Sequence, residues 1–195
     1  MRCLYCYNPE IVQGKGRLSF EKILAFLNSR KNLLDAVVFS GGECLLHKKS
    51  LSLIEEIKKM GFLVKIDTNG SSPDRMRKLL EKNLVDYVAL DFKAPKSKFE
   101  SITKSDLFVP FEETLDLLLK ANIPFEVRTT YHSDLLSKRD LKQMVTFLEN
   151  KKYSGNYYIQ YFRNNVTTLS KLEYSVNKIN ADELSTQTIK IIIRD

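Results

Sequence analysis

The stretch DAVVFSGGE, residues 35–43, combines the two features that decide the fold. Its first part is a short apolar run rich in β-branched residues, which predicts a buried strand over residues 35–40. Gly41 and Gly42 then end the run, because glycine permits the tight turn that follows such a strand. The same arrangement recurs along the chain, with apolar runs at residues 62–67, 87–91, 125–131, 157–162 and 189–193.

Amphipathic runs separate these predicted strands. Their apolar residues recur every three or four positions, which is the spacing of one helix face. Helices are predicted at residues 18–29, 50–60, 72–82, 111–120 and 137–150, with a weak helix from Ala181 and loops over 93–109 and 164–177. Such alternation indicates an α/β fold with a parallel sheet and right-handed crossovers, and strands that are apolar on both faces agree with it. An open doubly wound sheet and a barrel or partial barrel both fit the pattern.

The composition is that of a globular chain. Hydrophobic residues make up 43% of the 195 residues, which is enough for a sizeable core, and the few glycines and prolines exclude collagen. No apolar run approaches the roughly 18 residues that a membrane helix needs. The opening MRCLYC lacks the apolar region of a signal peptide. We therefore expect one domain over residues 1–195, a cytoplasmic location and no membrane partner.

The net charge of +7 permits an anionic ligand or an acidic partner. The 31 basic residues are interleaved with 24 acidic ones along the chain. Their densest cluster, residues 75–78, lies on a predicted helix and is interpreted as a solvated face. Because the chain also lacks a nucleic-acid-binding motif, no nucleic-acid partner is expected.

Polar residues and glycines gather at the ends of four predicted strands. They occupy residues 40–43, 67–70, 91–93 and 128–130, each at or just after the carboxyl end of its strand. The carboxyl ends of parallel strands lie along one edge of a sheet, where α/β proteins build their sites. The sequence therefore predicts that these four segments meet at one rim.

Two cysteines open the chain in the segment CLYC, residues 3–6. In a cytoplasmic protein, such thiols more often bind a metal or react than form a structural disulfide. The spacing alone leaves a zinc site, a thiol redox pair and an iron–sulfur cluster open. His47 and His132 belong to no motif and are expected at the surface or in loops.

The segment CLYC, Gly41-Gly42-Glu43 and Thr68-Asn69-Gly70, in this order and spacing, resemble the motifs of the radical S-adenosylmethionine superfamily. The resemblance implies a partial parallel (β/α)6 TIM-like barrel that uses a [4Fe–4S] cluster and S-adenosyl-L-methionine. It implies the following roles: Cys3 and Cys6 as cluster ligands, Tyr5 beside the adenine, Gly41, Gly42 and Glu43 around the methionine amine, Asp67, Thr68 and Asn69 at the ribose, Asp91 beside the cofactor, and Lys93 and Arg128 on the methionine carboxylate.

The resemblance is closest to the small activating enzymes of glycyl-radical enzymes. Residues 7–10, 39–46 and 90–95 look most like the activators of anaerobic ribonucleotide reductase. This implies reductive cleavage of S-adenosylmethionine to a 5′-deoxyadenosyl radical, which then removes a hydrogen from a glycine Cα of a partner enzyme. The implied partners are a glycyl-radical enzyme as protein substrate and an electron donor such as flavodoxin or ferredoxin.

The chain departs from the family pattern at its N-terminal end. In the family, three cysteines in a C-x3-C-x-x-C pattern hold the cluster, and here the first would stand two residues before Met1. The first barrel strand would lie further upstream, so we expect the reading frame to continue there. Cys44 is expected to be an ordinary loop residue. The alternatives are a cluster-less scaffold that binds S-adenosylmethionine or a partner, and a zinc or thiol C-x-x-C protein.

Overall fold

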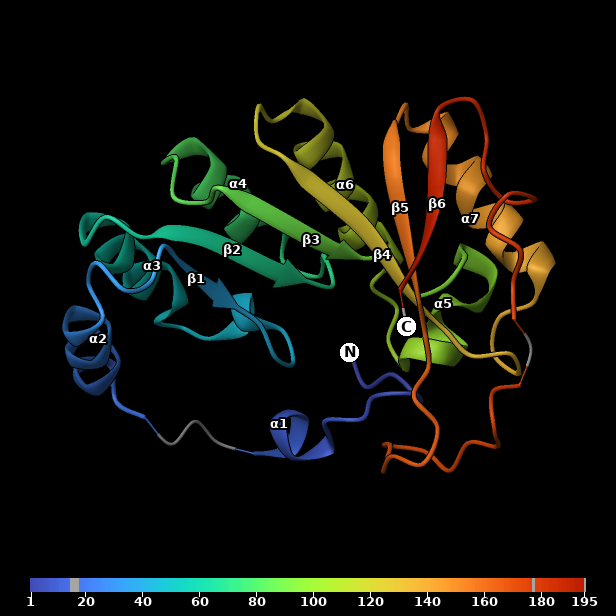
Figure 1. The fold of residues 1–195 in the computed structure, drawn as a ribbon, viewed down its shortest axis with the longest axis horizontal. Coiled ribbons are helices and arrows are strands. Elements are labelled where there is room, and N and C mark those ends of the chain that lie inside the picture. The colour runs from blue at the N-terminus through green and yellow to red at the C-terminus, as the bar shows by residue number, and fades with distance from the viewer. Residues whose placement is uncertain (15–17, 177, 195) are drawn as a thin grey trace.

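A computed structural model describes residues 1–14, 18–176 and 178–194, and one sheet of six parallel strands forms its centre. The strands lie side by side in chain order, and the sheet stays open, with β1 and β6 as its edges (Figure 1). They are β1 (Ala36–Phe39), β2 (Leu63–Thr68), β3 (Tyr87–Asp91), β4 (Phe125–Tyr131), β5 (Gly155–Tyr161) and β6 (Ile189–Arg194). The parallel α/β class and all six predicted strands are confirmed.

Helices connect the strands and lie mainly on one face of the sheet (Figure 1). They are α1 (Pro9–Gln13), α2 (Phe20–Ser29), α3 (Ser50–Lys59), α4 (Pro73–Glu81), α5 (Lys96–Thr103), α6 (Phe108–Lys120) and α7 (Lys138–Asn150), with a short 3₁₀ turn, η1, at Cys44–Leu46. Ser137 begins α7 with a capping box, in which its hydroxyl and the Asp140 carboxylate each accept a backbone N–H. Within the described residues, no helix has the length and apolar character needed to cross a bilayer.

The two faces of the sheet differ in chemistry. Ile66, Leu90 and Val127 lie on the apolar face and are fully buried. The opposite face carries charges: Glu126 is 5% exposed, and its carboxylate accepts a hydrogen bond of 2.9 Å from Arg194. The expectation of strands that are apolar on both faces is therefore wrong, because this second face buries charged side chains as pairs.

Two predictions between the strands are also wrong. The predicted loop over residues 93–109 contains α5, whose Phe99 and Ile102 are buried against the core. No helix begins at Ala181, where the chain makes a single turn and Ser185 donates its N–H to the Ala181 carbonyl at 2.9 Å.

The segment that follows β5 has no regular structure over residues 164–176, as predicted, and residue 177 of that predicted loop lies outside the described residues. It passes beside the N-terminal segment (Figure 1). Backbone hydrogen bonds join the two segments: Leu169 N–H donates to the Cys6 carbonyl at 3.0 Å, and Ser170 N–H donates to the Leu4 carbonyl at 3.2 Å. The first residues of the chain are thereby held next to the carboxyl ends of the strands.

Candidate functional site

A cavity of about 290 Å³ lies at the carboxyl ends of the strands. It brings together nine of the residues that the sequence singled out: Cys3, Tyr5, Cys6, Gly41, Gly42, Asn69, Asp91, Lys93 and Arg128. Glu43, Asp67 and Thr68 do not line it. The predicted rim of strand ends therefore exists. The cavity lies between this rim and the cysteine loop, Cys3–Cys6.

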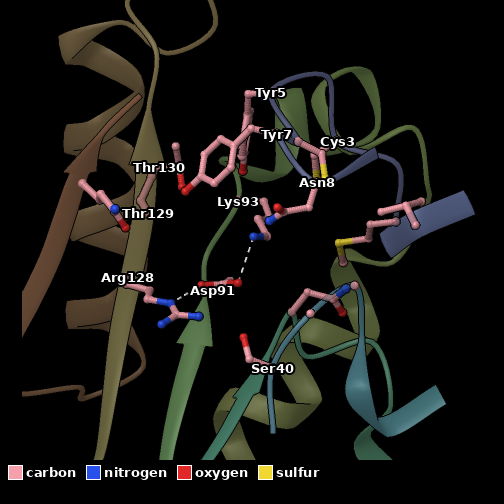
Figure 2. A pocket seen from close by; sticks show the side chains of 17 residues that line it. Cys3, Tyr5, Tyr7, Asn8, Ser40, Asp91, Lys93, Arg128, Thr129 and Thr130 are labelled. Atoms are coloured by element: carbon pink, nitrogen blue, oxygen red, sulfur yellow. Dashed lines mark hydrogen bonds and ion pairs between the residues drawn. The ribbon is translucent and has the colours of Figure 1, made fainter. Parts of the chain in front are cut away.

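A row of alternating charges forms the floor of the cavity. The pairing of β3 with β4 sets Asp91 opposite Arg128. One carboxylate oxygen of Asp91 accepts from Arg128 Nε, and the other accepts from Lys93 Nζ at 2.9 Å, as Figure 2 shows. Asp67 extends the row, with Arg128 Nη2 at 3.3 Å and Lys65 Nζ at 3.3 Å.

The two cations stabilise the charge of Asp91. Burial acts to raise the pKa of Asp91, but Lys93 and Arg128 outweigh it and hold that pKa below its usual value. Burial acts in the opposite direction on Lys93, whose pKa is nevertheless raised by Asp91 and Cys3. Within the described residues, Nη1 of Arg128 has no hydrogen-bond partner. The row therefore presents an N–H donor of a fixed cation that an anionic ligand group could use.

The cysteine loop closes the cavity from the N-terminal side. Cys6 N–H donates to the Cys3 carbonyl at 3.0 Å, which makes the tight turn that brings both thiols to the cavity. Burial raises the pKa of Cys3, although the Lys93 ammonium acts to lower it. Tyr5 is 4% exposed, and its hydroxyl has no hydrogen-bond partner among the described residues. The Lys93 ammonium lies 5.9 Å from the centre of the Tyr5 ring.

Gly41 and Gly42 supply backbone rather than side chains to the cavity wall. Their φ angles are +91° and +54°, a region that glycine enters at little cost. Two successive residues of this kind turn the chain sharply after β1 and leave main-chain groups at the cavity surface.

The Glu43 carboxylate points into the protein instead of the cavity. One oxygen accepts from Asn69 N–H at 2.8 Å, and the other accepts from Leu45 N–H at 3.2 Å. The Thr68 hydroxyl also donates to this carboxylate at 3.0 Å. Burial raises the pKa of Glu43, and these hydrogen bonds oppose the rise. Glu43 therefore joins the loops after β1 and β2, whereas the family resemblance implied a contact with the methionine amine.

Asp67 and Thr68 likewise lie behind the cavity wall. Asp67 pairs with Arg128, and the Thr68 hydroxyl is occupied by Glu43 and by the N–H of Gly70 at 3.0 Å. Of the three residues for which the resemblance implied a ribose contact, Asn69 alone lines the cavity.

The cavity also contains residues that carried no role in the sequence: Met1, Tyr7, Asn8, Val12, Ser40, Thr129, Thr130 and Gln160. Ser40, Thr129 and Thr130 belong to the strand-end segments 40–43 and 128–130, which the sequence had placed at the rim without an individual role for these residues. Gln160 was hidden in the aromatic run of β5, where it is the one amide side chain near the strand end.

Cys44 lies outside the cavity, in a neighbouring pocket that it shares with His47. Its thiol donates to the Asp67 carbonyl at 3.5 Å, and burial raises the pKa of Cys44 to about 12. Across residues 1–14, 18–176 and 178–194, no group of three or more His, Cys, Asp or Glu side chains could hold a metal ion.

Comparisons with known proteins agree with this geometry. A model of the Radical SAM superfamily matches residues 1–150. A protein of Methanocaldococcus jannaschii, named as a glycyl-radical enzyme activating enzyme, is 31% identical over 152 residues, which cover 74% of this chain and 62% of the relative. The chain thus spans less than two thirds of that relative's length.

Two solved structures share the fold. A domain of a pyruvate-formate lyase-activating enzyme from Bacteroides vulgatus has a TM-score of 0.56 at 14% identity, over 70% of this chain and 86% of that one. SuiB of Streptococcus suis, bound to S-adenosylmethionine, has a TM-score of 0.67 at 14% identity, over 100% of this chain and 47% of that one.

Proposed function

The chain belongs to the radical SAM superfamily, and we propose that it binds S-adenosylmethionine in the strand-end cavity and activates a glycyl-radical enzyme. The superfamily uses this cofactor together with a [4Fe–4S] cluster. One observation carries the proposal: a single cavity contains both thiols, the glycine turn and the row of charges.

The charges of the cavity suit S-adenosylmethionine, which carries an ammonium, a carboxylate and a sulfonium. The unpaired Nη1 of Arg128 is the proposed donor to the methionine carboxylate, with Lys93 beside it. The carbonyls of Gly41 and Gly42 are the proposed acceptors for the ammonium, and the Asn69 amide is the proposed ribose contact. Tyr5 remains the proposed neighbour of the adenine. The orphaned Tyr5 hydroxyl supports a polar ligand here, because buried hydroxyls are rarely left without partners.

The donor set fits the cluster in part. Cys3 and Cys6 line the cavity and would bind two of its irons, whereas Cys44 faces the neighbouring pocket. The family pattern has three cysteines. Bound there, the cluster would supply the electron that cleaves the sulfonium.

The proposed partner is an anaerobic ribonucleotide reductase, with a flavodoxin or ferredoxin as electron donor. The name of the Methanocaldococcus jannaschii relative supports an activating role, and the likeness of residues 7–10, 39–46 and 90–95 to ribonucleotide reductase activators supports this partner. In the proposed reaction one electron converts S-adenosylmethionine into methionine and a 5′-deoxyadenosyl radical. Transfer of a hydrogen atom from the glycine then leaves 5′-deoxyadenosine and a glycyl radical.

The test uses the chain extended by a Cys-Gly dipeptide before Met1, which completes the three-cysteine spacing. This extended chain is reconstituted with iron and sulfide and incubated anaerobically with S-adenosylmethionine, dithionite and purified anaerobic ribonucleoside-triphosphate reductase. We expect 5′-deoxyadenosine by chromatography and a glycyl-radical signal by electron paramagnetic resonance. Release of 5′-deoxyadenosine without the radical signal would reject this partner and keep the cofactor chemistry.

The presence of two thiols in the cavity favours a second candidate, a cluster-less protein that binds S-adenosylmethionine without cleaving it. This candidate predicts that iron-free protein binds the cofactor by calorimetry and releases no 5′-deoxyadenosine under the same conditions. A stable cluster on the 195-residue chain would exclude it.

A further inference from the structure

The irregular segment after β5 contacts the cysteine loop through main-chain hydrogen bonds. Leu169 N–H donates to the Cys6 carbonyl at 3.0 Å, and Ser170 N–H donates to the Leu4 carbonyl at 3.2 Å. On the other side, Leu4 N–H donates to the Ile102 carbonyl of α5 at 3.0 Å. The cysteine loop therefore lies between two segments that are distant in sequence, and each fixes part of its backbone.

The same segment is anchored at a second place, near the end of β4. The His132 side chain is fully buried, and its Nε2 is 3.0 Å from the Glu173 carbonyl. Its Nδ1 accepts from Asp134 N–H at 3.2 Å, which leaves Nε2 as the ring nitrogen that carries the proton. Ser133 N–H donates to the Ser175 hydroxyl at 3.0 Å. His132 lies in the loop after β4, one of the two places expected for it, but its side chain is buried there and anchors the segment.

Hydrogen bonds within the segment add to these two anchors. The Asn164 amide bonds Ser175 in both directions, donating to its carbonyl at 3.1 Å and accepting from its N–H at 3.0 Å. The Thr168 hydroxyl donates to the Ser170 carbonyl at 2.5 Å. A segment without helix or strand is thus held along its length by hydrogen bonds.

We infer that residues 168–170 act as a brace that positions the cysteine loop, and with it the thiols of Cys3 and Cys6. Leu169 and Ser170 act through their N–H groups rather than their side chains, and they touch no reacting atom. The inference goes beyond the proposed function, because it concerns the geometry of the loop whichever ligand the thiols take.

The brace can be tested by the reactivity of the thiols in the ligand-free protein. Ser170→Pro removes the N–H that holds Leu4. Ser170→Ala keeps that N–H. Lys171→Pro places the same rigid residue one position later, where the N–H donates no hydrogen bond in the described part of the chain. The readout is the rate of iodoacetamide labelling at each cysteine, resolved by mass spectrometry.

We expect Ser170→Pro to speed the labelling of Cys3 and Cys6 by about two- to tenfold, the opening expected from one lost hydrogen bond. Cys44 serves as the internal reference, because it is buried and its thiol donates a hydrogen bond to the Asp67 carbonyl, which belongs to neither the brace nor the cysteine loop. Ser170→Ala and Lys171→Pro should label like the parent. Parent-like labelling of Ser170→Pro would overturn the inference, and so would an equal rise at Cys44, which reports general loss of stability.

Discussion

Asp91 is the residue on which the charge row depends. Its two oxygens hold two cations at once, Arg128 through Nε and Lys93 through Nζ. If Asp91 loses its charge, Lys93 loses its carboxylate partner and Arg128 keeps only the longer contact of 3.3 Å with Asp67. Leaving a partly buried cation without its partner is costly, because the protein interior solvates charge poorly. Asp91 therefore serves the fold and the cavity together.

Asp91→Asn should lower the free energy of unfolding by about 3–5 kcal/mol, the usual cost of removing one partner from a buried pair. The measurement is urea unfolding at pH 7. Glu55→Gln is the matched control, because the Lys82–Glu55 pair lies at the surface and its loss should hardly move the midpoint. Equal midpoints for Asp91→Asn and the parent would contradict this expectation. They would mean that water screens the charges of Asp91, Lys93 and Arg128 from one another.

The stability of the protein should fall at acidic pH, because the pKa of Asp91 is lowered in the folded state. The pKa of Asp91 is lowered in the folded protein, so its contribution to stability is complete above its unfolded pKa, about 4. That contribution should disappear as the pH falls through the lower folded pKa. Urea midpoints measured from pH 6 down to pH 3 should therefore fall less steeply for Asp91→Asn than for the parent, and parallel curves would contradict the assignment.

Arg128→Lys keeps the positive charge but loses the planar fork that can grip a carboxylate. It should weaken S-adenosylmethionine binding by roughly 1.5–3 kcal/mol, the range for hydrogen bonds to charged groups. Calorimetric titration measures this. Lys65→Gln is the control, because Lys65 belongs to the same charge row but does not line the cavity. If Lys65→Gln weakens binding equally, the charge of the row matters rather than contact with Arg128.

At the scale of elements, the loop after β2 is fixed by close packing. Gly70 has a φ of +75°, and an added Cβ would lie 3.1 Å from the Phe111 Cα on α6. The Gly70 carbonyl also accepts from the Thr114 hydroxyl at 2.8 Å. Helix α6 thereby fixes the position of the loop that carries Asn69, which lines the cavity.

Gly70→Ala should lower the free energy of unfolding by about 1–3 kcal/mol more than Gly61→Ala. Gly61 has a similar φ of +95°, but its added Cβ would meet nothing within 4 Å, so it shows the backbone cost alone. Urea midpoints of the two variants give the difference. Equal losses would show that the loop moves away from α6 without strain.

Helices and strands whose apolar residues recur at a regular spacing could be predicted from the sequence. Those with few or irregularly spaced apolar residues could not. β2 and α7 follow their apolar spacing to within a residue or two. Helix α5 was missed because Phe99 and Ile102 are its only apolar residues, which is too few to show a helical period. The turn at Ala181 does not continue as a helix, since the Ser185 hydroxyl accepts the Ile191 N–H.

The candidate site was predictable where its residues follow strands, as with Asn69, Asp91 and Arg128. The functions of Glu43 and Asp67 could not be read locally, because their partners Thr68 and Arg128 lie 25 and 61 residues away and only the folded sheet brings them together. The same holds for Glu126 and Arg194, a pair 68 residues apart.

At the scale of the whole molecule, the number of thiols at the cavity decides whether a cluster can be held. The 195-residue chain should lose its iron readily after anaerobic reconstitution. Adding a Cys-Gly dipeptide before Met1 completes the three-cysteine spacing and should give a brown protein with about four irons per chain.

Cys3→Ala in the extended protein is the control and should abolish the colour. A stable cluster on the 195-residue chain would contradict the expectation, and would assign the third ligand to Cys44 or to an added thiol. Iron and sulfide analysis beside the absorption spectrum provides the measurement.

The order of the sheet also has a consequence in time. Because the strands pair in chain order, each strand can join the sheet as the ribosome releases it, from β1 onward. The cysteine loop is an exception: it emerges early, yet its backbone partners Ile102 and Ser170 emerge far later. During synthesis the cysteine loop therefore lacks these backbone partners while the sheet is incomplete. The cavity can take its final shape only after residue 170 has been translated.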